Sequence, residues 1–89
     1  MNQARVNKVL DEMSERGMDH LIISDPSSID YLTGYNNHPG ERMFVLLLSL
    51  DGNHTMFLNK LFYLDQDLQM NLVWYADTED GPALVADAL

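Results

Sequence analysis

The sequence contains no cysteine, and this absence excludes two kinds of site. Without thiols the chain forms neither a disulfide framework nor a thiolate metal site. A small domain without such cross-links depends on its hydrophobic core or on a partner for stability. Hydrophobic residues make up 46% of the chain, which is enough for one core of ordinary composition.

Basic residues are also scarce. Five Lys and Arg residues stand against fourteen Asp and Glu residues, which gives a net charge of −9. Nucleic-acid binding requires clustered Lys and Arg that neutralise phosphates, and here the basic residues are scattered. The same negative charge disfavours an anionic membrane surface. We therefore expect neither nucleic acid nor a membrane as a partner.

Long hydrophobic runs are missing as well. The longest run, residues 43–48, is far shorter than the roughly 20 residues that span a bilayer. The first residues lack the apolar segment of a secretory signal, so a cytoplasmic protein is expected. Since domains typically contain about 50 to 250 residues, residues 1–89 are interpreted as a single domain.

Local patterns in the first part of the chain predict a helix, a strand and a second helix. Apolar residues at helical spacing predict a helix over residues 3–16. A short apolar run at residues 20–24 is typical of a buried strand. Asp25 and Pro26 are a preferred N-cap and first helical residue, and Gly34 is suited to end the short helix that they begin.

The remaining part of the chain predicts further strands. Residues 42–50 predict a strand, and because residues 43–48 are apolar on both alternating faces, it is expected to be central and covered on both sides. An Asp-Gly turn then leads to a strand at residues 54–58. Residues 59–68 fit a helix and a strand equally well, and residues 71–75 predict another strand. A hairpin beside strands that helices separate predicts an α/β domain with a mixed sheet and flanking helices.

A last helix is expected over residues 83–89. It has an apolar stripe, but no Gly or basic residue follows that would end it. A helix of about seven residues is marginal by itself. We therefore expect a domain that is truncated at its C-terminal end, and an exposed apolar face that favours self-association.

No pattern in the chain forms a catalytic or metal-binding site. The histidines, His20, His38 and His54, lack the spacing of a metal-binding helix, and His20 and His54 are expected at exposed strand ends. The glycines form no phosphate-binding loop, and a Gly-x-Ser-x-Gly motif is absent. The acidic residues at 77–80 are expected to form a solvated turn that interacts with the last helix.

The most loop-like stretch, residues 35–42, differs from the rest. It contains His38, Glu41 and Arg42 among residues with no evident role in packing. Loops that rigid elements hold in place often carry binding function, although most are only connectors. Both interpretations stay open on residue types alone.

Several motifs resemble the N-terminal domain of the creatinase/prolidase family. They are Asp-Pro at 25–26, Tyr-Leu-Thr-Gly at 31–34, Glu-Arg at 41–42 and Trp-Tyr-Ala-Asp at 74–77. The resemblance covers nearly the whole chain. It implies a ribonuclease-H-like α/β fold and the non-catalytic N-terminal domain of an Xaa-Pro dipeptidase, a metallopeptidase.

The family places catalysis in a C-terminal "pita-bread" domain, where carboxylates and a histidine hold two divalent metals, often manganese. The resemblance thus implies that this chain lacks the metal ligands and is inactive alone. It also implies homodimerisation and a loop that shapes the partner subunit's substrate pocket. Transferred to this sequence, the loop is residues 35–42, with His38 and Arg42 near the substrate carboxylate and Glu41 orienting Arg42.

An interaction module that keeps the fold without peptidase activity is the alternative. A nuclease-like enzyme is suggested by the fold alone, and the net charge of −9 disfavours it. The same motifs are compatible with a dipeptidase, an aminopeptidase or a creatinase-like parent protein.

Overall fold

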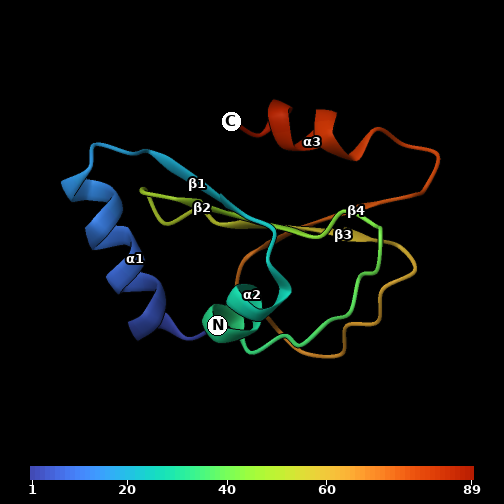
Figure 1. The fold of residues 1–89 in the computed structure, drawn as a ribbon, viewed down its shortest axis with the longest axis horizontal. Helices are drawn as coiled ribbons and strands as arrows, with labels where there is room; N and C mark the ends of the chain where they lie inside the picture. The colour runs from blue at the N-terminus through green and yellow to red at the C-terminus, as the bar shows by residue number, and fades with distance from the viewer.

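The computed structural model describes residues 1–89 as helices on both sides of one sheet (Figure 1). The elements are α1 (Gln3–Glu15), β1 (His20–Ile23), α2 (Pro26–Thr33), β2 (Val45–Ser49), β3 (Thr55–Asn59), β4 (Asn71–Tyr75) and α3 (Gly81–Asp87). The strands lie in the order β1-β2-β3-β4, antiparallel except for the parallel pair β3 and β4. The predicted α/β domain with a mixed sheet and flanking helices is confirmed. No helix is long and apolar enough to cross a membrane.

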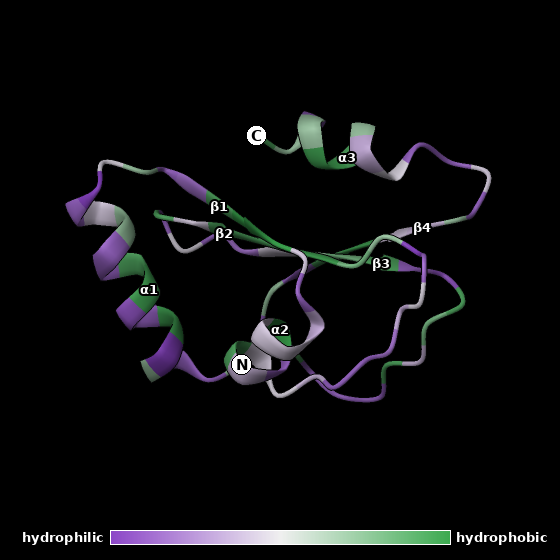
Figure 2. Ribbon diagram, viewed as in Figure 1, coloured by the Kyte–Doolittle hydropathy of each residue, from purple (hydrophilic) through white to green (hydrophobic).

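Two hydrophobic clusters lie on opposite faces of the sheet. The larger cluster joins Val6 of α1 and Ile29 of α2 to Leu46 of β2. The smaller cluster joins Val85 of α3 to Leu47, the next residue of β2. All five residues of β2 are buried, because successive side chains enter opposite clusters. The prediction of a central strand covered on both sides is therefore confirmed, and the strands form the most continuously hydrophobic part of the ribbon (Figure 2).

Short-range hydrogen bonds determine where α2 and α3 begin. The Asp25 carboxylate accepts hydrogen bonds from the backbone N–H of Ser28 at 3.2 Å and from its hydroxyl at 2.7 Å. Asp80 caps α3 in the same way. Gly34 ends α2 at φ 78°, a left-handed conformation that strains a residue with a side chain. These caps agree with the local signals in the sequence.

Some boundaries differ from the sequence-based expectation. β2 begins at Val45 rather than at residue 42, because the segment before it bonds to the end of β4 instead of to a neighbouring strand. Residues 60–70 form turns and irregular structure, neither of the two forms considered for residues 59–68. The last helix begins at Gly81, one residue after its cap.

His54 was expected at an exposed strand end, and this is wrong. The residue is buried before β3, and its Nδ1 accepts a hydrogen bond from the backbone N–H of Ser49 at 3.1 Å. The bond links the two ends of the turn between β2 and β3. It requires an unprotonated Nδ1, and burial lowers the pKa of His54, an effect that the charge of Asp51 partly opposes.

The buried His54 predicts a pH-dependent stability. An unfolded histidine titrates near about pH 6.5. Because the folded pKa is lower, the unfolded chain binds more protons between the two values, so the free energy of unfolding rises with pH in this window. Urea denaturation between about pH 5 and 7 measures the slope. In His54→Gln the slope is expected to decrease, and equal slopes in the two proteins would contradict the assignment. The carboxyl groups of Asp25, Asp51 and Asp77 have lowered pKa values. Their contribution to the free energy of unfolding is therefore lost in a separate range, as the pH falls below about 4.

A matched pair of substitutions tests the larger cluster. Ile29 is 0% exposed and Ile22 is 48% exposed. Ile29→Val is expected to reduce the free energy of unfolding by about 0.5–1.5 kcal/mol, because it removes a buried methyl group. Ile22→Val is expected to stay within about 0.5 kcal/mol of the original protein. Equal effects in urea denaturation would show that Ile29 is not part of the core.

Candidate functional site

The candidate loop, residues 35–42, connects α2 to the strand segment that leads into β2. His38, Glu41 and Arg42 are all exposed. The structure gives no hydrogen bond or ion pair to the side chains of His38 and Glu41, whereas Arg42 is held by a residue far along the chain. Of the three predicted residues, only Arg42 is bonded to another side chain.

Arg42 forms a two-pronged pair with Asp77. Its Nε donates to Asp77 Oδ1 and its Nη2 donates to Asp77 Oδ2, both at 3.1 Å. The carboxylate bonded to Arg42 is therefore that of Asp77, and the structure gives no bond between Arg42 and Glu41, the residue expected beside it. The hydrogen bond from Arg42 is the main reason that the pKa of Asp77 is lowered, and the same bond raises the pKa of Arg42. The two side chains are 45% and 53% exposed, so solvent screens the pair and its contribution to stability is small.

Asn59 stands behind this ion pair. The residue is fully buried, its Nδ2 donates to Asp77 Oδ1 at 2.6 Å, and its Oδ1 accepts from the backbone N–H of Leu61 at 2.9 Å. Asn59 and Tyr75 are paired in the parallel ladder, so the carboxyl ends of β3 and β4 lie at one edge of the sheet. The Tyr75 hydroxyl donates to the carbonyl of Met43, which attaches the backbone next to Arg42 to the same edge.

Sequence reasoning missed Asn59, Tyr75 and the pairing role of Asp77. One signal was available: polar residues end or directly follow two neighbouring strands. In open α/β sheets, ligands bind outside the carboxyl ends of parallel strands. That rule needs the strand order, which the sequence did not provide.

The other end of the loop is attached through Tyr35. Its buried side chain donates to the carbonyl of Tyr63 at 2.7 Å and packs edge-on against Phe44, with the ring centroids 5.6 Å apart. A tyrosine hydroxyl is protonated at neutral pH, and burial raises the pKa of Tyr35 further. The loop and the segment between β3 and β4 consequently run beside one another (Figure 1). Within the loop, Asn37 Nδ2 is buried without a hydrogen-bond partner.

A surface hollow of about 450 Å³ adjoins Arg42. Its lining residues are Glu41, Arg42, Met43, Tyr75, Asp77, Glu79, Gly81 and Pro82. A Cβ at Gly81 would lie 2.9 Å from the Met43 side chain, so glycine permits the start of α3 to approach this segment. The hollow combines one guanidinium with three carboxylates, a set that recognises charge, and no Ser, His or Lys side chain lines it.

The side chains of this chain do not fit the metal pair that the resemblance implies. No group of three or more His, Asp or Glu residues is placed to hold a metal ion. We assign no metal-dependent step to them.

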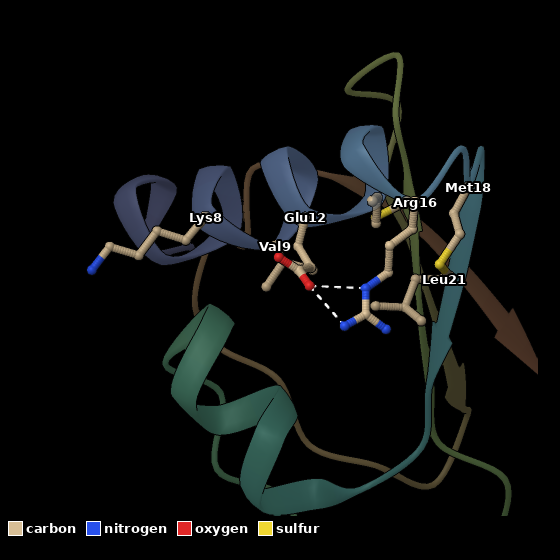
Figure 3. Close-up of a pocket in the computed structure, with 7 residues that line it drawn as sticks. Lys8, Val9, Glu12, Arg16, Met18 and Leu21 are labelled. Carbon is tan, nitrogen blue, oxygen red and sulfur yellow. Dashed lines mark hydrogen bonds and ion pairs between the residues drawn. The ribbon is translucent and has the colours of Figure 1, made fainter.

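A second hollow lies between α1 and β1 (Figure 3). Val9, Met13, Met18 and Leu21 supply its apolar lining. The ion pair between Arg16 and Glu12 lies at its rim, while Lys8 points away from it. None of residues 35–42 lines it, so it is separate from the candidate site.

Comparison with known sequences finds a matching protein family and related peptidases. The family described as Creatinase/Prolidase N-terminal domain matches residues 5–89. An uncharacterized peptidase of Staphylococcus aureus (strain bovine RF122 / ET3-1) is 32% identical over 79 residues, which are 85% of this chain and 22% of the relative. The chain therefore spans about a fifth of the length of the curated relatives that it matches.

Solved structures agree with the fold. A proline dipeptidase from Streptococcus pneumoniae has a TM-score of 0.80 and 25% identity, with 100% of this chain and 66% of that chain covered. A dipeptidase from Pyrococcus horikoshii OT3 has a TM-score of 0.79 and 27% identity, with 96% of this chain and 24% of that chain covered. The match thus covers essentially all of this chain and one part of a larger dipeptidase.

The attachment of the loop through Tyr35 is testable. Tyr35→Phe removes a buried hydrogen bond and leaves the Tyr63 carbonyl without this donor, so the free energy of unfolding is expected to fall by about 0.5–1.5 kcal/mol. Amide hydrogen exchange in residues 36–41 is expected to become faster. Tyr31→Phe is the matched control, because the Tyr31 side chain is 58% exposed and its hydroxyl has no partner. If Tyr35→Phe and Tyr31→Phe have the same free energy of unfolding and the same exchange rates, this hydrogen bond does not hold the loop.

Proposed function

The chain belongs to the creatinase/prolidase N-terminal domain family, and from this membership we propose that it is the non-catalytic N-terminal domain of a cytoplasmic, metal-dependent Xaa-Pro dipeptidase. The observation that carries the proposal is the match over the whole chain to a proline dipeptidase. Hydrolysis is then assigned to the remainder of a longer protein. This domain serves dimerisation and shapes the substrate pocket of the neighbouring subunit.

Arg42 is the residue that meets the substrate in this proposal. A guanidinium presents five N–H donors along two edges. Asp77 occupies the edge formed by Nε and Nη2, and the edge formed by Nη1 and Nη2 has no partner. That edge matches a second carboxylate, such as the C-terminal carboxylate of an Xaa-Pro dipeptide. His38, exposed in the middle of the loop, adds a donor that approaches the same substrate.

The surface beside the loop supports a homodimer. Leu61 is 69% exposed and Tyr63 is 77% exposed. Both lie in the segment that accepts the hydrogen bond from Tyr35, so exposed apolar groups adjoin the loop. Exposed apolar groups of this kind are typical of surfaces that a partner covers. A second copy that covers them would bring its own substrate pocket toward residues 35–42.

The kinetic test uses the full-length dipeptidase of which this chain is proposed to be the N-terminal domain. Arg42→Ala is expected to raise KM for Xaa-Pro dipeptides by roughly 10- to 100-fold and to change kcat little, because it removes a charged contact to the substrate carboxylate. Arg42→Lys is expected to restore part of the loss. The matched control is Arg16→Ala, which removes an exposed, ion-paired arginine from α1.

Three results would contradict the proposal. An unchanged KM in both Arg42 variants would remove Arg42 from the substrate pocket. Release of proline by the isolated chain with manganese, above a buffer blank, would place catalysis in this domain. A reading frame that stops after Leu89 would favour the interaction module in place of the peptidase domain.

A further inference from the structure

Arg42, Asp77 and Asn59 form a continuous chain of hydrogen bonds from the surface to the interior. The exposed guanidinium donates to the Asp77 carboxylate, and the fully buried Asn59 amide donates to the same carboxylate. The orientation of Asn59 is determined, because its Oδ1 accepts the backbone N–H of Leu61 and its Nδ2 must therefore face Asp77. A rigid, buried donor thus holds one oxygen of an otherwise exposed carboxylate.

We infer that Asp77, oriented by Asn59, is a positioning residue that holds the Arg42 guanidinium in one orientation and directs its free edge to an incoming carboxylate. The inference rests on the proposed function and deepens it, since it names the residues that prepare Arg42 for the substrate. A long, flexible side chain loses much rotamer freedom when it binds a ligand. A pair that orders the guanidinium beforehand reduces that loss.

Asp77 is not needed to attach the loop to the domain, because other hydrogen bonds hold both ends of the loop. The backbone at Met43 is bonded to Tyr75 independently of the ion pair, and the start of the loop is bonded through Tyr35. Loss of the Asp77 carboxylate therefore leaves both attachments in place. Because solvent screens the exposed pair, its loss is expected to affect overall stability little and to release mainly the Arg42 side chain.

The chain contains a second arginine–carboxylate pair that lacks this arrangement. Arg16 donates from Nε and Nη2 to a single oxygen of Glu12, four residues earlier on the exposed face of α1. No buried side chain donates a hydrogen bond to the Glu12 carboxylate, in contrast to Asn59 and Asp77. This pair is a matched control for every measurement on Arg42 and Asp77.

The test measures the order of the Arg42 side chain in the isolated chain. ¹⁵N relaxation of Arg42 Nε–Hε is expected to give an order parameter above about 0.6 in the original protein and below it in Asp77→Asn. Asp77→Glu is expected to restore most of the order, because it restores the carboxylate. Asn59→Asp keeps the acceptor for Leu61 but loses the donor to Asp77, so it is expected to lower the order of Arg42 as well. Glu12→Gln is expected to leave Arg42 unchanged.

Either of two results would overturn the inference: an unchanged Arg42 order parameter in Asp77→Asn, or no restoration by Asp77→Glu. In the longer enzyme, Asp77→Asn is expected to raise KM several-fold with kcat retained. If Arg42→Ala raises KM and Asp77→Asn does not, the positioning role fails while the proposed function stands. If Arg42→Ala leaves KM unchanged, the proposed function fails, and the relaxation data still decide whether Asp77 positions Arg42.

Discussion

Burial of β2 on both faces of the sheet is the constraint on which the rest of the structure depends. Its apolar residues alternate between two clusters, so each face needs a helical cover. The helices α1 and α2 cover one face, and α3 covers the other (Figure 1). The chain must therefore pass around the sheet between β4 and α3. The turn that contains Asp77 and Asp80 makes this passage at the edge where Arg42 lies.

The parallel pair of β3 and β4 gives that edge its polar character. Parallel strands end on the same side, so Asn59 and the residues that follow Tyr75 come together there. Hydrogen bonding of the buried Asn59 is satisfied by Leu61 and Asp77, as a buried amide requires. The arrangement places the Arg42 guanidinium, paired with Asp77, outside the core. An exposed guanidinium in this place suits the contact to a neighbouring active site that we propose.

The candidate loop combines attachment with exposure. Tyr35 is bonded to Tyr63 in the segment between β3 and β4, and Met43 is bonded to Tyr75 of β4. His38 and Glu41 are exposed to solvent. A loop with secured ends keeps its position on the domain, and its exposed middle stays available to a second molecule. The exposed Leu61 and Tyr63 extend that surface.

Much of the fold and part of the site followed from the sequence, because those features depend on near neighbours. Asp25 and Asp80 cap residues three positions away, Gly34 acts through its own backbone, and the two-sided apolar pattern marked the central strand. The loop at residues 35–42 was also predicted, whereas the choice of Arg42 as a site residue stays a prediction. Tertiary structure decided the burial of His54, the irregular segment at 60–70 and the partner of Arg42. Arg42 and Asp77 are 35 positions apart, and they meet because the strand order brings the end of β4 beside the start of β2. Local preference contains no information on such a pairing, since it arises only when the sheet forms.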